Sequence, residues 1–188
     1  MAGTAILHRP MGRRLFLGGL AAGVWASVAP ASTGATQSFR FASIDGGTID
    51  LGDWRGGPVL VVNTASLCGF APQFDDLQAL QDRYGSRGLK VLAVPSDDFR
   101  QELATEAAVK DFCETNFDLT LPMTEITHVK GPEAHPFFAW LKAEHGFEPG
   151  WNFNKVLLDG EGRVAGTWGA PAKPLGRAIT SRIEALLP

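Results

Sequence analysis

A strongly apolar run, Pro58 to Val62, stops abruptly in small and polar residues, and a helical pattern begins shortly afterwards near Pro72. A short, continuous apolar run bounded by turn-forming residues is typical of a buried strand. We therefore expect a strand, a turn and a helix in this order, which is the building unit of an α/β fold. A single cysteine, Cys68, lies in the expected turn.

Two interpretations of Cys68 are open from its local sequence. A cysteine between a strand and a helix start lies near free backbone N–H groups and the positive end of the helix dipole. Such surroundings favour the thiolate, which is the nucleophilic form. Free cysteine is also among the most buried residue types, so the same position suits a small packed side chain.

The rest of the chain continues the alternation of strand and helix patterns. The expected strands are 39–41, 48–50, 59–63, 89–95, 119–123 (a short edge strand), 155–158 and 164–168. The expected helices are 72–84, 106–117, 133–145 and 174–187. Asp45-Gly46-Gly47 is a hairpin turn signal between the first two strands. This order predicts one α/β domain, with a sheet that begins parallel, ends antiparallel and carries helices on both faces.

The first 31 residues have the pattern of an export signal. The pair Arg13-Arg14 precedes an apolar stretch at 15–28, and small residues follow up to Ala31. A basic start, an apolar middle and a small-residue end are typical of a secretory signal. Adjacent arginines followed by Leu-Phe-Leu indicate the twin-arginine route. A membrane anchor fits less well because glycines and a proline interrupt a short run. We expect cleavage near Ala31, a periplasmic protein and a mature domain at 38–188.

The mature part of the chain is acidic. The formal net charge is −3, but the first 31 residues carry three arginines and no acid, which leaves 14 basic and 20 acidic residues, or −6. This balance argues against nucleic acid or an anionic membrane as a partner. The mature sequence has no further apolar run of membrane-spanning length, so we expect no stable membrane anchor.

Metal and phosphate chemistry find no support in the mature sequence. It has no phosphate-binding glycine loop, and His128, His135 and His145 lack the spacing of paired metal ligands. We expect these histidines to be surface or cap residues, and we expect neither a metal nor another cofactor.

The chain has two cysteines, Cys68 and Cys113. Gly69-Phe70-Ala71 follows the first, so the Cys-x-x-Cys motif of dithiol reductases is absent. In an oxidising compartment a structural disulfide between the two cysteines is a reasonable alternative, and composition alone does not decide it.

The segment Asn63-Thr-Ala-Ser-Leu-Cys-Gly69 resembles the glutathione peroxidase family, with cysteine in place of selenocysteine. The similarity covers residues 38–187 through further segments in the family's order: Leu89–Pro95, Phe112-Cys113, Leu121–Met123, Gly131–Lys142 and Trp151–Phe153. Several motifs in the right order make a resemblance specific. It implies a thioredoxin-like α/β sandwich, with a central mixed sheet flanked by helices and an N-terminal β-hairpin.

The resemblance also implies roles for individual residues. Cys68 would be the peroxidatic residue, whose thiolate attacks the peroxide O–O bond and becomes a sulfenic acid. Trp151 and Asn152 match the family's Trp-Asn pair, whose N–H groups lie beside the sulfur as donors to developing negative charge. Cys113 would be the resolving residue, which condenses with the sulfenic acid to a disulfide that an external dithiol reduces.

One site position departs from the family pattern. Asp98 stands where the family usually has a glutamine, and the following segment is one residue shorter before Gln101. An ionised aspartate would repel the Cys68 thiolate instead of donating to it. We expect either that Asp98 is held protonated or turned aside, or that Gln101 replaces the missing donor.

The resemblance favours a thioredoxin-dependent peroxidase. The segment 142–151 lacks the long insertion of tetrameric, glutathione-using members, which favours a monomer with a thioredoxin-like reductant over glutathione. Because Cys113 falls on the inward face of its helix, we expect the reduced cysteines to lie beyond the bridging limit of ~7 Å between Cα atoms. Local unfolding of the helix at 106–117 would then precede disulfide formation.

The sequence therefore predicts a periplasmic thiol peroxidase that reduces hydrogen peroxide or organic hydroperoxides. The alternative is a non-catalytic redox sensor or binding protein on the same fold, which the aspartate at position 98 suggests.

Overall fold

The computed structural model describes residues 1–3 and 38–188. The predicted export signal covers residues 1–31. All of it except residues 1–3 lies outside the described residues. Within the described part, no helix is both long and apolar enough to cross a membrane.

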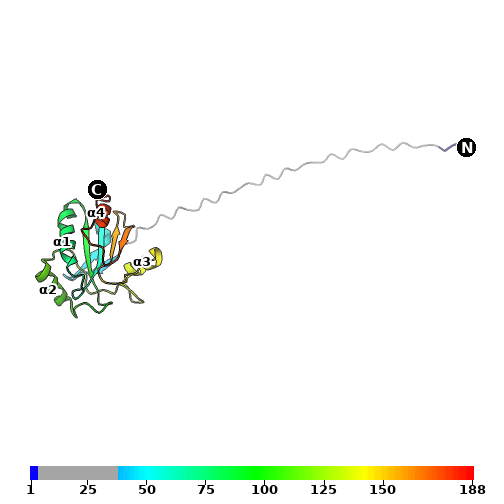
Figure 1. The fold of residues 1–188 in the computed structure, drawn as a ribbon. Helices are drawn as coiled ribbons and strands as arrows, with labels where there is room; N and C mark the ends of the chain where they lie inside the picture. The colour runs from blue at the N-terminus through cyan, green and yellow to red at the C-terminus, as the bar shows by residue number, and fades with distance from the viewer. Residues whose placement is uncertain (4–37) are drawn as a thin grey trace. The chain divides into compact units, whose positions relative to one another are not determined.

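A four-stranded mixed sheet forms the centre of the fold (Figure 1). Its strands, in spatial order, are β4 (Lys90–Pro95), β3 (Val59–Thr64), β5 (Lys155–Leu158) and β6 (Val164–Trp168). Strand β3 pairs with β4 in parallel, and β5 pairs with both of its neighbours in antiparallel. The predicted change from parallel to antiparallel pairing is confirmed.

The predicted N-terminal hairpin is confirmed as a separate two-stranded sheet. Strand β1 (Arg40–Ala42) pairs antiparallel with β2 (Thr48–Asp50). Gly46 and Gly47 in the turn both have positive φ, at 87° and 80°, a conformation that glycine adopts without steric cost. A 3₁₀ helix, η1 (Leu51–Trp54), follows β2.

Four α-helices cover the two faces of the sheet. They are α1 (Gln73–Tyr84), α2 (Glu106–Phe117), α3 (Pro136–His145) and α4 (Arg177–Glu184), with a short 3₁₀ helix, η2 (Gly85–Arg87), after α1. Apolar residues of α1, α2 and α4 pack on one face, and those of α3 and the hairpin pack on the other (Figure 1). All six residues of β3 are buried, which explains why its sequence is a continuous apolar run instead of an alternating one.

Three predictions were wrong: one strand, and the bounds of two helices. The segment 119–123 forms only an isolated bridge between Met123 and Ala93, because Pro122 has no N–H to donate to a ladder. Helix α3 begins at Pro136 instead of residue 133, where the His135 ring accepts from the Phe137 N–H as a cap. Helix α4 spans only 177–184, which leaves Leu175 before the helix and 40% exposed.

Candidate active site

Cys68 lies between the end of β3 and the start of α1, as predicted, and it is buried as a free thiol. The backbone after it forms tight turns, in which the Ala71 N–H donates to the Cys68 carbonyl at 2.8 Å. The N–H groups of Gln73 and Phe74 likewise donate to nearby carbonyls. The N–H groups of Ala71, Gln73 and Phe74 are therefore occupied by local carbonyls.

Asn63 at the end of β3 holds the segment that carries the Trp-Asn pair. Its side-chain amide donates to the Trp151 carbonyl at 2.9 Å, and its side-chain oxygen accepts from the Asn154 N–H at 3.0 Å. The Asn63 carbonyl also accepts from the Phe153 N–H at 2.6 Å. Phe153 has φ of +60°, a conformation unusual for a non-glycine residue, and these bonds hold it there. The sequence analysis did not assign this role to Asn63.

Asn152 and Gln101 meet beside the Cys68 loop. Asn152 is fully buried, and its Nδ2 donates to Oε1 of Gln101 at 3.1 Å. The Gln101 carbonyl accepts from the N–H of Leu67, the residue before Cys68, at 2.9 Å. Gln101 thus joins the buried amide of Asn152 to the backbone that carries the cysteine.

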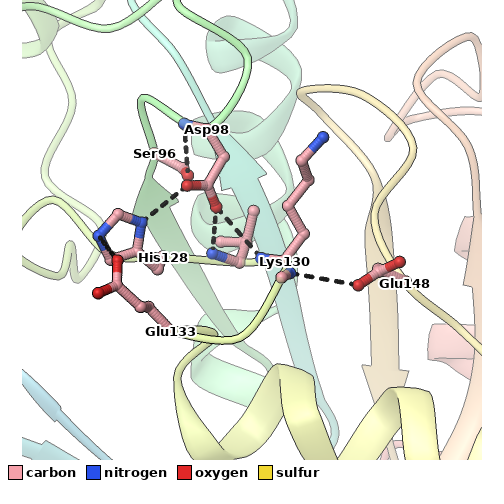
Figure 2. Close-up of polar contacts among 8 residues, drawn as sticks. Ser96, Asp98, His128, Lys130, Glu133 and Glu148 are labelled. Atoms are coloured by element: carbon pink, nitrogen blue, oxygen red, sulfur yellow. Dashed lines mark hydrogen bonds and ion pairs between the residues drawn. The ribbon is translucent and has the colours of Figure 1, made fainter.

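The Asp98 side chain bonds to another segment, residues 128–130 (Figure 2). One carboxylate oxygen contacts Nδ1 of His128 at 2.7 Å, and the other accepts from the N–H groups of Val129 and Lys130 at 2.6 and 3.1 Å. Burial alone would raise the pKa of Asp98, but these hydrogen bonds outweigh it and hold the pKa below its ordinary value. The lowered pKa argues against the expected protonated Asp98, and its contacts with residues 128–130 agree with a side chain that is turned aside.

Trp151 lies next to Asn152 in the chain but is 42% exposed. Its ring contacts that of Phe99, with 5.4 Å between the ring centroids. Leu67, beside Cys68, is also exposed, at 60%. Large exposed apolar side chains thus lie in both segments that frame the cysteine, where a partner or substrate could cover them.

Cys113 is fully buried in α2 and is a free thiol, so this structure has no disulfide between the two cysteines. The same hydrophobic cluster holds both residues. Burial, with the negative charges of Glu102 and Glu114 in support, raises the pKa of Cys113 to about 12. The thiol is therefore protonated and unreactive while it stays in this position.

Glu102 is a buried carboxylate beneath the Cys68 loop, and the sequence analysis did not single it out. Its Oε1 accepts from the N–H groups of Ser66 and Leu103, at 3.0 and 2.8 Å. Burial raises its pKa and the Asp97 charge adds to this, while the nearby Ser66 hydroxyl and the N–H groups of Leu103 and Ser66 lower it. Burial of a charged residue is the signal that marks Glu102, and a sequence alone does not reveal it.

Lys155 is a second buried charged residue near this site. Its Nζ donates to Oε1 of Gln73 at 2.5 Å and to the Ala170 carbonyl at 3.1 Å. Burial lowers the pKa of Lys155 to about 8, although the Asp76 charge opposes the shift. The side chain thus connects the start of α1 to the loop that follows β6.

A pocket of about 490 Å³ opens beside Gly69, the residue after Cys68. Its apolar lining comes from the start of α1 and from the segment before α4, namely Phe70, Pro72, Pro171 and Leu175. Asp76 and Lys173 are its charged residues. An apolar pocket with few charged groups suits a largely hydrocarbon ligand.

The three histidines take structural positions away from the cysteine. His128 bonds to Asp98, His135 caps α3, and the His145 ring lies against Trp140 at the end of the same helix. The expectation of surface or cap positions is confirmed. Among residues 1–3 and 38–188, no group of three or more His, Cys, Asp or Glu side chains is arranged to hold a metal ion.

Known proteins resemble this chain in sequence and in structure. The glutathione peroxidase family model matches residues 36–142. A hydroperoxy fatty acid reductase, gpx1 of Synechocystis, is 41% identical over 163 residues, which cover 79% of this chain and 94% of the relative. A glutathione peroxidase of Lactococcus lactis is 37% identical over 141 residues, covering 72% of this chain and 90% of that protein.

Solved structures also resemble this chain in fold. The apo crystal structure of Trgpx superposes with a TM-score of 0.59 at 30% identity, covering 80% of this chain and 96% of that one. A thioredoxin-family thiol:disulfide interchange protein from Chlorobium tepidum has a TM-score of 0.61 at 18% identity, and the match covers 80% of this chain and 94% of that protein. The thioredoxin-like fold is confirmed, and the chain belongs to the glutathione peroxidase family.

Proposed function

We propose that this peroxidase acts through Cys68 as a thiol peroxidase. The Cys68 thiolate would attack the O–O bond of a hydroperoxide, release water or an alcohol and become a sulfenic acid. The observation that carries the proposal is the link from Asn152 through Gln101 to the backbone at Leu67, because it puts two side-chain amides beside the cysteine loop. Amide donors stabilise the negative charge that develops in such a reaction.

Cys113 is the proposed resolving residue. It is the only other cysteine of the chain, and it belongs to the same buried cluster as Cys68. Its attack on the sulfenic acid would form an intramolecular disulfide, which a thioredoxin-like dithiol protein then reduces. Because Cys113 is fully buried in α2, part of this helix would have to open first.

Mass spectrometry of alkylated protein tests the proposed cycle. In reduced protein that is denatured in an alkylating agent, both cysteines should be modified, whereas one equivalent of hydrogen peroxide added beforehand should convert them to a Cys68–Cys113 disulfide. Cys68→Ser should abolish peroxide consumption, whereas Cys113→Ser should stop at an oxidised Cys68. A bridge already present in the protein as purified under reducing conditions would contradict the proposal and favour a structural disulfide.

The pocket beside Gly69 supports organic hydroperoxides with an apolar body as substrates. Its lining is mostly hydrocarbon, and the Synechocystis relative is named for its reduction of hydroperoxy fatty acids. Leu175→Glu should lower kcat/KM for a fatty acid hydroperoxide while leaving that for hydrogen peroxide within about twofold, since only the larger substrate needs the apolar wall. Equal losses with both substrates would exclude the pocket as the substrate site.

The reductant and the compartment are parts of the same proposal. We propose a monomer that is recycled by a thioredoxin-like protein, with glutathione as the poorer donor, and export by the twin-arginine route. Turnover coupled to a thioredoxin system, compared with a glutathione system, tests the reductant. Cell fractionation of the full chain and of an Arg13→Lys, Arg14→Lys variant tests the export, because the variant should stay in the cytoplasm.

The alternative of a redox sensor has lost the observation that suggested it. Asp98 bonds to His128 and to the backbone of Val129 and Lys130, and these contacts support a carboxylate that does not face Cys68. A sensor would form the disulfide but turn over poorly with every dithiol tested.

A further inference from the structure

Glu102 is held against the loop that carries Cys68 by one of its two carboxylate oxygens. Oε1 accepts from the Ser66 and Leu103 N–H groups, while Oε2 is buried and has no hydrogen-bond partner among the described residues. The residue as a whole is only 9% exposed. A buried carboxylate oxygen without a donor is costly, and the fold maintains it here.

The unpartnered oxygen belongs to a larger group. Within residues 38–188, the buried side-chain polar atoms without a partner are Oε2 of Glu102, Oγ of Ser66, Oγ1 of Thr64 and Oδ1 of Asn152. Thr64 and Ser66 lie on the segment that leads to Cys68, and Asn152 bonds to the neighbour of Glu102. Unsatisfied buried groups that gather at one place commonly indicate a catalytic role or bound water.

The resolving step creates a need for a proton acceptor at this place. Attack on a sulfenic acid requires the thiolate of Cys113, yet this buried thiol has its pKa raised to about 12 by burial and by the charges of Glu102 and Glu114. Cys113 belongs to the same buried cluster as Cys68, and Glu102 is bonded to the backbone that leads to Cys68.

We propose that Glu102 is the general base of the resolving step, an inference that rests on the thiol peroxidase function proposed above. Its free oxygen takes the proton of the Cys113 thiol as that sulfur attacks the sulfur of the Cys68 sulfenic acid. The S–S bond forms and the S–O bond breaks, and the leaving hydroxide takes the same proton to become water. The Cys113 sulfur is oxidised and the Cys68 sulfur is reduced, so no other oxidant is required.

The attachment of Glu102 suits this role even if α2 opens. Glu102 precedes α2, which begins at Glu106, and is bonded to the backbone of the Cys68 loop. Opening of the helix would therefore move Cys113 but leave the carboxylate at the Cys68 loop, where the Cys113 thiol has to arrive in order to attack. Burial raises the pKa of Glu102, and the Asp97 charge adds to this rise, against the hydrogen bonds from Ser66 and Leu103. A carboxylate with a raised pKa is a stronger base.

Glu102→Gln should slow disulfide formation if Glu102 is a general base, and speed it if Glu102 only repels the Cys113 thiolate. The glutamine keeps an acceptor for the Ser66 and Leu103 N–H groups but cannot take a proton. If Glu102 is the base, disulfide formation after one equivalent of hydrogen peroxide should slow by about 10- to 100-fold. If its only effect is to repel the Cys113 thiolate, removing the charge should speed this step instead, and that result would overturn the proposal.

Glu114→Gln is the matched control. Glu114 also raises the pKa of Cys113, but it is an exposed residue of α2 that pairs with Lys110 at 3.8 Å on the surface. We expect this variant to form the disulfide as fast as wild type or faster. An equal slowing in both variants would show a general loss of charge to be responsible and would reject Glu102 as a specific base.

A stopped-flow experiment separates the two chemical steps. Consumption of peroxide by reduced protein reports Cys68 oxidation, and appearance of the disulfide on acid quenching reports resolution. Glu102→Gln should affect the second step far more than the first, and equal effects on both would indicate a structural role only. Wild-type protein that fails to consume peroxide, or that never forms the disulfide, would refute the proposed function itself and is thereby distinguishable.

The pH dependence of wild-type disulfide formation tests the proposal without any substitution. With Glu102 as base, the rate should rise as this carboxylate ionises and then level off before the alkaline range. An unassisted Cys113 thiol would instead give a rate that keeps rising with hydroxide concentration, and such a profile would contradict the proposal.

Discussion

Nδ2 of Asn152 lies 3.1 Å from Oε1 of Gln101, and this contact joins a residue that the family pattern predicts to one that it does not. The Gln101 carbonyl accepts in turn from the N–H of Leu67, next to Cys68. Asp98, at the family's glutamine position, bonds elsewhere. The proposal that Gln101 supplies the missing amide therefore has support from its position.

Gln101→Leu should slow the oxidation of Cys68 by peroxide by about 10- to 100-fold, because one amide that can stabilise developing charge is lost. Stopped-flow measurement of the first step under single-turnover conditions checks this. Asp98→Asn is the control and should change the same rate by less than threefold, since its side chain faces His128. The reverse ranking of the two variants would return the donor role to position 98.

Asp98→Asn should instead lower the free energy of unfolding by about 1–3 kcal/mol, because a carboxylate that accepts several hydrogen bonds is lost. The pKa of Asp98 is lowered in the fold, so its contribution is present above the ordinary value of 3.8 and is lost as the pH falls through the folded value. Urea unfolding of both proteins between pH 3 and pH 8 should show the difference shrinking at the acid end.

The partner His128 should add the opposite pH dependence. The hydrogen bond to Asp98 raises the pKa of His128, so its contribution is complete below 6.5 and is lost as the pH rises through the raised value. The pair should thus contribute most between pH 3.8 and 6.5. A His128→Gln variant whose stability differs from that of wild type by the same amount at pH 5 and pH 9 would contradict this.

Lys155→Met should remove a rise in stability in the alkaline range. Burial lowers the pKa of Lys155 to about 8, below its ordinary value of 10.5, so the unfolded chain holds more protons between these values. The wild-type protein should therefore gain stability as the pH rises from about 8 towards 10.5, relative to the variant. Thermal or urea unfolding of both proteins across this range is the measurement, and parallel curves would show that folding does not lower the pKa of Lys155.

Much of the fold could be predicted from local pattern because the helices and strands are regular and strongly apolar. Helix α2 begins and ends where predicted, since Thr105 caps its start and Asp118 adopts a left-handed conformation after its end. Two errors fall at Pro122 and Pro136, where a missing N–H or a cap outweighs the apolar spacing, and a third falls at Gly176, after which α4 begins. Boundaries of this kind depend on single hydrogen bonds, which periodicity does not report.

The sequence by itself determined the mixed α/β architecture, the place of Cys68 between a strand and a helix, and the membership in a peroxidase family. These follow from periodicity and from motifs in a fixed order, both of which are properties of the chain taken locally. Only the tertiary structure decided that Asp98 turns to His128, that Gln101 meets Asn152, and that Glu102 is buried under the cysteine loop. Each of these contacts joins residues that are distant in the chain, and the direction of a side chain depends on the donors that folding brings within reach.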